Sequence, residues 1–378
     1  MIYLDHAAAT PVSPKVFEAM KPYFSDDFFN PSAAYLPAKK VAHEYEEAKG
    51  VIAHAIGAKA SDIVITAGAT EANNLAFNII TSDGSSVLYL VTEHNSVCKV
   101  AEQYGGVAVN VDKNGRVLMD DLKNKITDDT MLISVALVNN ELGTIQPLSE
   151  IAAIIREVRL DRLARGIKRP LYLHSDASQA LNLLNINVAR LGVDLLTLNS
   201  AKIYGPKGVG ALYVSHDIKL LPISVGGGQE RGLRSGTENV PGVIGFAKAV
   251  EEVEKHKNGN RKKYAEFKKI LLSELKDYEL INKKHSLDNF VVLSYNGIDA
   301  ERLIFLLEDR GVYVSTGAAC AANKGLKSHV LAAIGLTDSE IDGSLRLTLG
   351  ETNTEEQIRE VARIINEVVE LERKRING

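Results

Sequence analysis

A lysine and an aspartate stand directly after two apolar runs of the chain. Lys202 follows the run DLLTL and precedes a glycine-rich turn, in NSAKIYGPKG, and Asp176 follows the run LYLHS. A lysine between a strand and a tight turn can form a Schiff base, and a neighbouring aspartate can keep a pyridinium nitrogen charged. The pair therefore predicts a pyridoxal phosphate (PLP) site. Taken alone, such a pair is far more often a surface lysine and a loop cap.

Polar residues follow other apolar runs in the same way. Ala69 and Thr70 open a helix-sized segment after IVIT, where unpaired N–H groups can bind phosphate. His94 follows VLYLV, and an imidazole there could stack on an aromatic cofactor or move a proton. Asn140 and Gln179 follow two further runs. Each motif alone also fits a plain turn or a capped helix, but together they predict one crevice at the strand ends.

Short apolar runs alternate with helix-sized amphipathic segments between about residues 40 and 250. Several runs are apolar on both faces, which is typical of parallel strands covered by helices. The pattern predicts a doubly wound α/β domain with a mostly parallel central sheet. The expected strands are residues 63–66, 87–91, 131–138, 171–175, 194–198 and 210–215.

A second pattern begins with one long helical stretch over residues 243–277. Mixed strands and helices follow it, which predicts a smaller α+β domain. The strand-like segment at the N-terminus is expected to join this domain, since a chain end is easily added to a neighbouring sheet. We therefore predict a large domain at residues 13–256, and a small domain formed by residues 1–12 and 257–378.

The composition excludes several classes of protein. The chain is 45% hydrophobic and 24% charged, with a net charge of −4, so no charge excess attracts it to nucleic acid or to acidic membranes. Its two cysteines cannot form a disulfide framework, which favours a reducing compartment. We see neither a secretory signal nor a membrane-spanning run, nor any metal-binding motif, and expect a cytoplasmic protein.

Two later segments complete the set of candidate residues. Residues 226–239, GGGQERGLRSGTEN, combine glycines, arginines and Thr237, which suits anion recognition or a loop that reaches a partner subunit. Residues 312–325 place Cys320 among small residues, so we expect an accessible loop and a reactive thiolate. Cys98 has no such surroundings and is interpreted as structural.

The order of these motifs resembles one enzyme family over essentially the whole chain. The segments GATE, TEHN, VNNELG, DASQ, KIYGPKG, GGGQERGLRSGTEN, GAAC and LRLTLG follow one another as in the cysteine desulfurases. These are PLP enzymes of fold type I in the class V aminotransferase group. The length of the cysteine loop resembles the first desulfurase group, whose cysteine delivers sulfur to a scaffold protein. The resemblance implies a large domain with a mostly parallel sheet and a smaller α+β domain.

The resemblance also implies roles around the cofactor ring. Lys202 would be the Schiff-base lysine and would later move the proton at the substrate Cα. Asp176 would keep the pyridine nitrogen protonated, and His94 would stack on the ring. Asn140 and Gln179 would contact the O3′ side of the ring, and Asn140 would also contact the substrate.

Further roles concern the phosphate, the substrate and the subunits. Ala69 and Thr70 would bind the cofactor phosphate, and Thr237 would reach the phosphate in the opposite protomer, which implies a homodimer. Arg346 would clamp the carboxylate of L-cysteine. Cys320 would take the sulfur as a persulfide and leave L-alanine. The sulfur would pass to an iron–sulfur scaffold or another acceptor protein, for cluster assembly or tRNA thiolation.

The chain departs from the family pattern at two positions. Ala201 stands where the family has a histidine that contacts the phosphate, so Ser200 is expected to supply part of that contact. Tyr35 replaces another histidine. The alternatives are a selenocysteine lyase, another PLP β-lyase, and a PLP-binding scaffold subunit without turnover. The basic stretch at residues 156–169 is interpreted as a solvated helix end.

Overall fold

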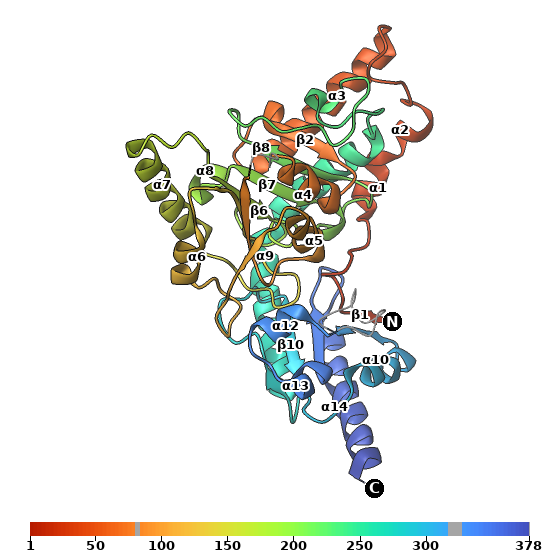
Figure 1. Cartoon of the computed structure of the whole chain (residues 1–378). Coiled ribbons are helices and arrows are strands. Elements are labelled where there is room, and N and C mark those ends of the chain that lie inside the picture. Colours follow the sequence, from red (N-terminus) through yellow and green to blue (C-terminus); the bar gives the residue numbers. More distant parts are fainter. Residues whose placement is uncertain (80–83, 317–326, 378) are drawn as a thin grey trace.

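The computed structural model describes residues 1–79, 84–316 and 327–377 (Figure 1). Cys320 lies outside the described residues. Among the described residues, no helix is both long and apolar enough to cross a membrane.

A seven-stranded sheet forms the centre of the larger part of the molecule. Its strands lie in the order β2-β8-β7-β6-β5-β3-β4. β8 runs antiparallel to β2 and β7 on its two sides, and the other neighbouring strands are parallel. The predicted doubly wound α/β fold with a mostly parallel sheet is thus confirmed. The strands are β2 (Ile63–Thr66), β3 (Ser86–Leu90), β4 (Val107–Val109), β5 (Thr130–Ser134), β6 (Tyr172–Asp176), β7 (Leu195–Asn199) and β8 (Gly210–Val214).

Two details of this sheet differ from the sequence prediction. The edge strand β4 was not predicted, because it has only three residues and its Val107 is exposed. The strand predicted at 131–138 ends at Ser134. Beyond it, the N–H of Val135 still donates to the carbonyl of His174 in β6, and the N–H of Leu137 donates to the carbonyl of Asp176 at the end of β6.

Helices cover both faces of the sheet, as the doubly apolar strands require. On one face, side chains of β2, β3 and β5 pack with α4 and α5; on the other, the alternate side chains pack with α3, α7 and α9. The helices of this part are α1 (Pro14–Met20), α2 (Pro22–Ser25), α3 (Leu36–Ala55), α4 (Ala69–Phe77), α5 (Asn95–Gln103), α6 (Met119–Lys125), α7 (Leu148–Ala164) and α8 (Val188–Leu191), with short 3-10 helices η1 (Ala60–Asp62), η2 (Ser200–Lys202) and η3 (Glu230–Gly232).

A smaller antiparallel sheet lies below the large one in Figure 1. Its order is β12-β13-β10-β9, and a separate parallel pair joins β1 to β11. The strands are β1 (Ile2–Tyr3), β9 (Glu279–Leu280), β10 (Phe290–Ser294), β11 (Val312–Tyr313), β12 (Ser315–Thr316) and β13 (Ser344–Thr348). The helices are α9 (Val240–Glu274), α10 (Ala300–Asp309), α12 (His329–Ala333), α13 (Asp338–Asp342) and α14 (Glu355–Asn377).

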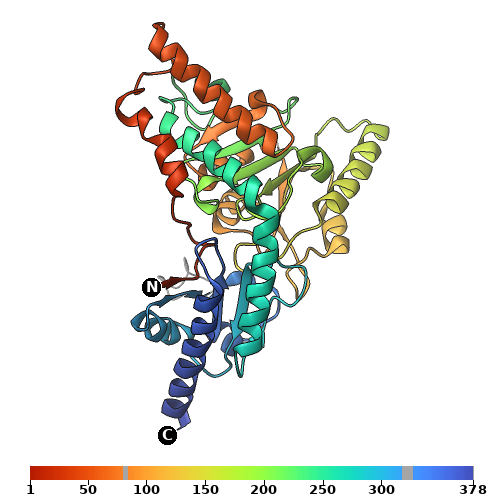
Figure 2. The ribbon, with the colours of Figure 1, turned by 180° about the vertical axis from the view of Figure 1, so that it is seen from behind.

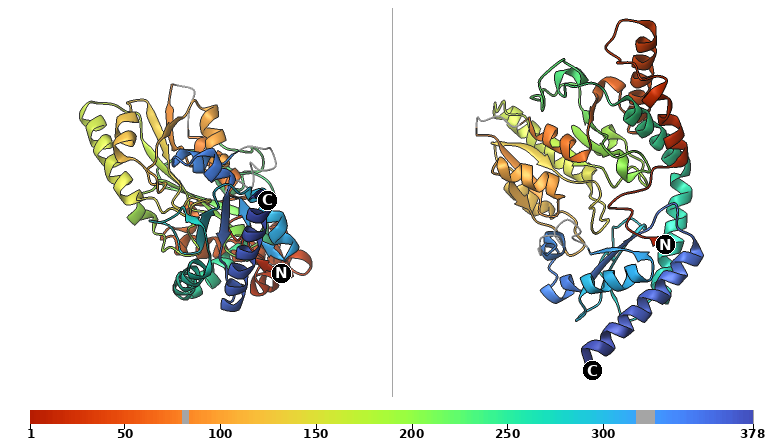
Figure 3. Two further views of the ribbon diagram at one scale, coloured as in Figure 1. Left: turned by 90° about the horizontal axis from the view of Figure 1, so that it is seen from below. Right: turned by 90° about the vertical axis from the view of Figure 1, so that its right-hand side faces the viewer.

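One long helix and the N-terminal segment connect the two sheets. Figure 2 shows α9 running from the large sheet to the small one, and Figure 3 shows the N-terminus beside the small sheet. Asp5 pairs with Thr348 at the end of β13, while the N–H of Thr10 bonds to the carbonyl of Ala201 beside the large sheet. The predicted boundary at residues 256 and 257 falls inside α9, and the division into two domains stays a prediction.

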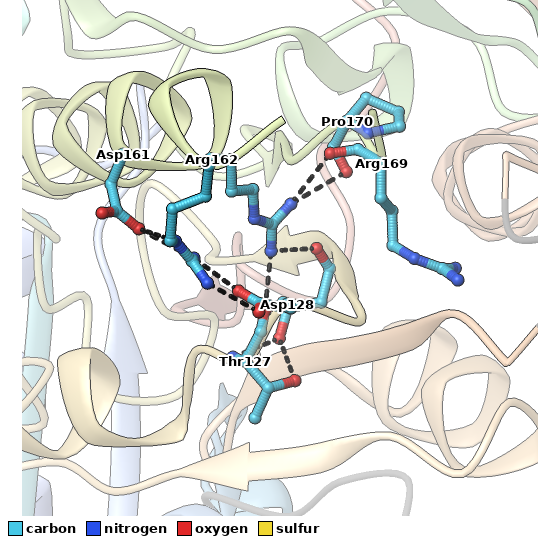
Figure 4. Close-up of polar contacts among 8 residues, drawn as sticks. Thr127, Asp128, Asp161, Arg162, Arg169 and Pro170 are labelled. Carbon is cyan, nitrogen blue, oxygen red and sulfur yellow. Dashed lines mark hydrogen bonds and ion pairs between the residues drawn. The ribbon is translucent and has the colours of Figure 1, made fainter. Parts of the chain in front are cut away.

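The interpretation of residues 156–169 as a solvated helix end is wrong at Arg162. This side chain is only 2% exposed, and its guanidinium donates to the carbonyls of Thr127 and Thr130 at 2.7 and 2.8 Å (Figure 4). It also donates to the carbonyls of Arg169 and Pro170. Arg162 therefore joins the segments that enter β5 and β6. Sequence could not show this, because an arginine on a helix looks the same whether it faces water or unpaired carbonyls.

Candidate active site

Polar side chains from both sheets line one cavity at the carboxyl ends of the parallel strands. Its volume is about 320 Å³, within the range of sites for small molecules. The crevice predicted from the strand ends therefore exists, although the role of each residue stays a prediction. The predicted site residues that line it are Ala69, Thr70, His94, Asn140, Asp176, Gln179, Lys202 and Arg346.

Lys202 reaches the cavity from η2, directly after β7. The Asn199 side chain accepts from the N–H of Ala201 and so starts this short turn. The Lys202 Nζ donates to the carbonyls of Ala7 and Ala8 at 2.7 and 2.5 Å, and Gln179 donates to the same Ala7 carbonyl at 3.0 Å. The N-terminal segment therefore holds the amine at the cavity.

Asp176 ends β6 with its carboxylate held by two donors. Its Oδ2 accepts from the Asn73 side chain of α4, and its Oδ1 accepts from the N–H of Ser178, both at 2.9 Å. Asp176 itself is buried. A carboxylate fixed in this way suits a long-lived pairing with a cationic ring nitrogen.

His94 caps the N-terminus of α5 at the edge of the cavity. Its Nδ1 accepts from the N–H of Ser96 at 3.1 Å, which places the proton of the neutral ring on Nε2. Burial lowers the pKa of His94. The negative charge of Asp176 opposes this effect, and the positive charge of Lys202 reinforces it. A lowered pKa favours the uncharged imidazole, and an imidazole ring can stack on an aromatic cofactor.

The N-terminus of α4 faces the same cavity through Ala69 and Thr70. Gly68 precedes it with a φ of 145°, a backbone conformation that side chains rarely allow. The first N–H groups of a helix have no partner within it and attract anions. This end of the cavity therefore suits a phosphate.

Arg346 enters from β13 of the small sheet and is 4% exposed. Its Nη2 forms an ion pair with Asp5 at 2.6 Å, and its Nη1 donates to the carbonyl of Asn140 at 2.9 Å. The guanidinium plane is thus fixed at the cavity. A substrate carboxylate would compete with Asp5 for it.

Two predicted residues, Ser200 and Thr237, are among the described residues but do not line the cavity. The buried Oγ of Ser200 lies against Gly205, and Ser200 is not among the residues that line the cavity. Thr237 lines a separate hollow with Glu230 and Arg234, so any role in a cofactor site would be in a partner subunit. Cys320 lies outside the described residues.

The cavity wall also contains residues that were not predicted from sequence, among them Ala7, Ala8, Glu141 and His329. The two alanines accept hydrogen bonds through their backbone carbonyls, and a pattern of side chains in the sequence cannot predict such contacts. Glu141 directly follows Asn140 in the VNNELG motif, so its polar position after a strand was a usable signal. His329 comes from a short helix of the small sheet, and only the tertiary fold brings it to the cavity.

Comparison with known proteins agrees with this site. A family model described as Aminotransferase class-V matches residues 2–361. The chain belongs to the class-V aminotransferase family. A putative cysteine desulfurase IscS 1 of Bacillus subtilis is 38% identical, with 97% of this chain and 98% of that protein aligned. A cysteine desulfurase IscS 1 of Archaeoglobus fulgidus is 40% identical over 98% and 97% of the two chains.

Solved structures of this family share the fold. A NifS-like protein superposes with a TM-score of 0.90 at 29% identity, covering 98% of this chain and 99% of the other. SspA in complex with cysteine gives a TM-score of 0.79 at 32% identity, covering 92% and 99%. The resemblance to cysteine desulfurases of the class V group is therefore confirmed, and so are the fold and the enzyme class.

The class-V family implies PLP, and the chemistry of the cavity fits it. An amine from Lys202, a held carboxylate from Asp176, a neutral imidazole from His94 and a helix N-terminus at Ala69 surround one space. These groups match an aldehyde, a pyridine nitrogen, a ring face and a phosphate, respectively. When bound, PLP supplies an electron sink for bond cleavage at an amino acid.

Proposed function

We propose that the chain is a PLP-dependent cysteine desulfurase, which converts L-cysteine to L-alanine and transfers the sulfur to Cys320 as a persulfide. The observation that carries the proposal is the meeting of Lys202, Asp176 and Arg346 at one cavity, from two different sheets. A lysine and a carboxylate serve the cofactor, and a fixed guanidinium serves an amino-acid carboxylate. The desulfurase names of the relatives support the choice of L-cysteine.

Each residue then has a defined task. Arg346 binds the substrate carboxylate in place of Asp5 and so orients Cα and Cβ in the cavity. Lys202 anchors the cofactor and moves the proton at the substrate Cα. Asp176 holds the proton of the pyridine nitrogen, and the neutral His94 packs on the ring face. The backbone N–H groups at the start of α4 bind the phosphate.

The sulfur step balances without an external oxidant. The Cys320 thiolate attacks the sulfur of the bound cysteine, a new S–S bond forms, and the Cβ–S bond breaks. The electron pair of that bond, with a proton, completes the methyl group of alanine, so Cβ is reduced while sulfur passes to Cys320 as a persulfide. This assignment of Cys320 rests on its sequence context.

We propose a homodimer in which Thr237 reaches the cofactor phosphate of the partner. Exposed apolar side chains support this, since Phe28 and Leu36 are both exposed and flank residues 31–32 in the chain. Residues 31–32, between α2 and α3, and residues 230–231, on the loop that carries Thr237, line one hollow. We further propose that the persulfide serves an iron–sulfur scaffold or a tRNA-thiolation partner. A cytoplasmic location would keep the Cys320 thiol reduced.

The decisive experiment compares two single-cysteine variants. With L-cysteine and a thiol reductant, the wild type should release alanine and sulfide in equal amounts. Cys320→Ala should still bind PLP and L-cysteine, but should lose almost all sulfide release.

Cys98→Ala is the matched control. Burial raises the pKa of the Cys98 thiol to about 12, and its Sγ donates to the carbonyl of Glu93. Cys98 is therefore unreactive, and its variant should keep the activity. Full sulfide release by Cys320→Ala would contradict the persulfide step and indicate a β-lyase. A wild type without visible PLP absorbance, even after PLP is added, would refute the cofactor assignment.

A further inference from the structure

Glu141 is a buried carboxyl at the wall of the cavity, only 6% exposed. The Asn139 side chain fixes its position. Asn139 Oδ1 accepts from the N–H groups of Glu141 and Leu142 at 2.9 and 2.8 Å, and its Nδ2 donates to the carbonyl of Thr92 at 2.8 Å. The loop after β5 is thus tied to the loop after β3. Glu141 therefore extends from a rigid part of the large sheet.

The partner of Glu141 belongs to the small part of the molecule. Ser328 donates its hydroxyl to Glu141 Oε2 at 2.5 Å, and its Oγ accepts from the N–H of Leu331 as the N-cap of α12. The next residue, His329, bonds through Nε2 to the carbonyl of Glu93 at 2.9 Å and lines the cavity. Two polar contacts therefore dock the first turn of α12 on the strand ends of the large sheet.

The positive charge of Arg346 attracts the Glu141 carboxylate but does not replace Ser328 as its hydrogen-bond donor. Among the described residues, Arg346 is the cation that attracts the Glu141 carboxylate, yet its own hydrogen bonds go to Asp5 and to a backbone carbonyl. Burial raises the pKa of Glu141 to about 7. In either protonation state one carboxyl oxygen can accept the Ser328 hydroxyl. Arg346 therefore stays available for a substrate carboxylate.

We propose that Glu141 is a positioning residue for sulfur transfer, which acts by docking Ser328 and the start of α12 on the cavity. Ser328 follows Cys320 by only eight positions in the chain, so the contact anchors the start of α12 close in sequence to the sulfur acceptor. It also keeps His329 in the cavity wall. The inference rests on the proposed desulfurase function. The hydrogen bonds described for the side chains of Glu141 and Ser328 do not include Lys202, Asp176 or Arg346.

The test separates positioning from binding. Glu141→Ala and Ser328→Ala should each lower kcat for alanine release by at least about tenfold, since a small misplacement of a reacting group has effects of this size. The KM for L-cysteine should stay within about threefold, and the PLP absorbance should be unchanged. Glu141→Gln and Ser328→Thr keep an acceptor and a hydroxyl, and should retain most of kcat.

Thr337→Ala is the matched control. Thr337 caps the next helix, α13, and donates to Glu340 at 2.6 Å in the same kind of contact, but away from the cavity. Hydrogen exchange in α12 should accelerate in Glu141→Ala and Ser328→Ala and stay unchanged in Thr337→Ala. The inference is wrong if the two alanine variants keep wild-type kcat, or if Thr337→Ala loses as much. An inactive wild type would refute the desulfurase function itself, and this inference with it.

Discussion

Replacing Arg162 by methionine tests whether this buried arginine joins two strands. The substitution keeps an unbranched side chain but removes the donors to the Thr127, Thr130, Arg169 and Pro170 carbonyls (Figure 4). Two of these bonds, at 2.7 and 2.8 Å, are charge-assisted and short. Bonds of this kind contribute about 1.5 to 3 kcal/mol each, and the desolvation of the guanidinium offsets part of the sum. We expect Arg162→Met to lose about 3 to 5 kcal/mol of stability.

The assay is urea-induced unfolding followed by circular dichroism, because the chain has no tryptophan. Arg165→Met, at the C-cap of the same helix, is the matched control. Arg165 pairs with Asp128 and Asp161 at the surface, where ion pairs contribute little, so its loss should be much smaller. Equal losses in the two variants would refute the role of Arg162. So would an unfolding midpoint of Arg162→Met that matches the wild type.

Three further substitutions test other parts of the structure. Gly143→Ala should destabilise the fold by about 2 kcal/mol or more, measured by thermal unfolding, because Gly143 has a φ of 69° and an added Cβ would lie 2.5 Å from the Phe290 ring. Burial raises the pKa of Glu141 from 4.5 to about 7, so this carboxyl costs the folded state stability as pH rises through that window. Between about pH 4 and pH 8, the stability of Glu141→Gln should therefore gain about 3 kcal/mol relative to wild type in urea titrations, and a constant difference would contradict the shift. Arg346→Lys should raise the KM for L-cysteine at least about tenfold in steady-state assays, because lysine cannot bind a carboxylate bidentately, and an unchanged KM would remove Arg346 from the substrate site.

Short-range patterns were enough to place much of the site. Lys202, Asp176 and His94 each follow a buried apolar run, and such residues meet at one edge of a parallel sheet. Cys320 was singled out because its neighbours in the sequence are small residues rather than a large apolar run. Strand β4 was not predicted, because three residues are too few to show a pattern of alternating apolar and polar residues.

By itself, the sequence determined the fold class, the family and the residues at the strand ends, because these depend on local apolar runs and on the polar residue that follows each one. The tertiary structure decided which distant segments complete the cavity. Arg346 pairs with Asp5 and Glu141 with Ser328, across 341 and 187 positions. No local pattern encodes such pairs, because they exist only once the small sheet packs on the large one. Packing within the large part of the molecule decided that Arg162 is buried and that Thr237 lies in a separate hollow.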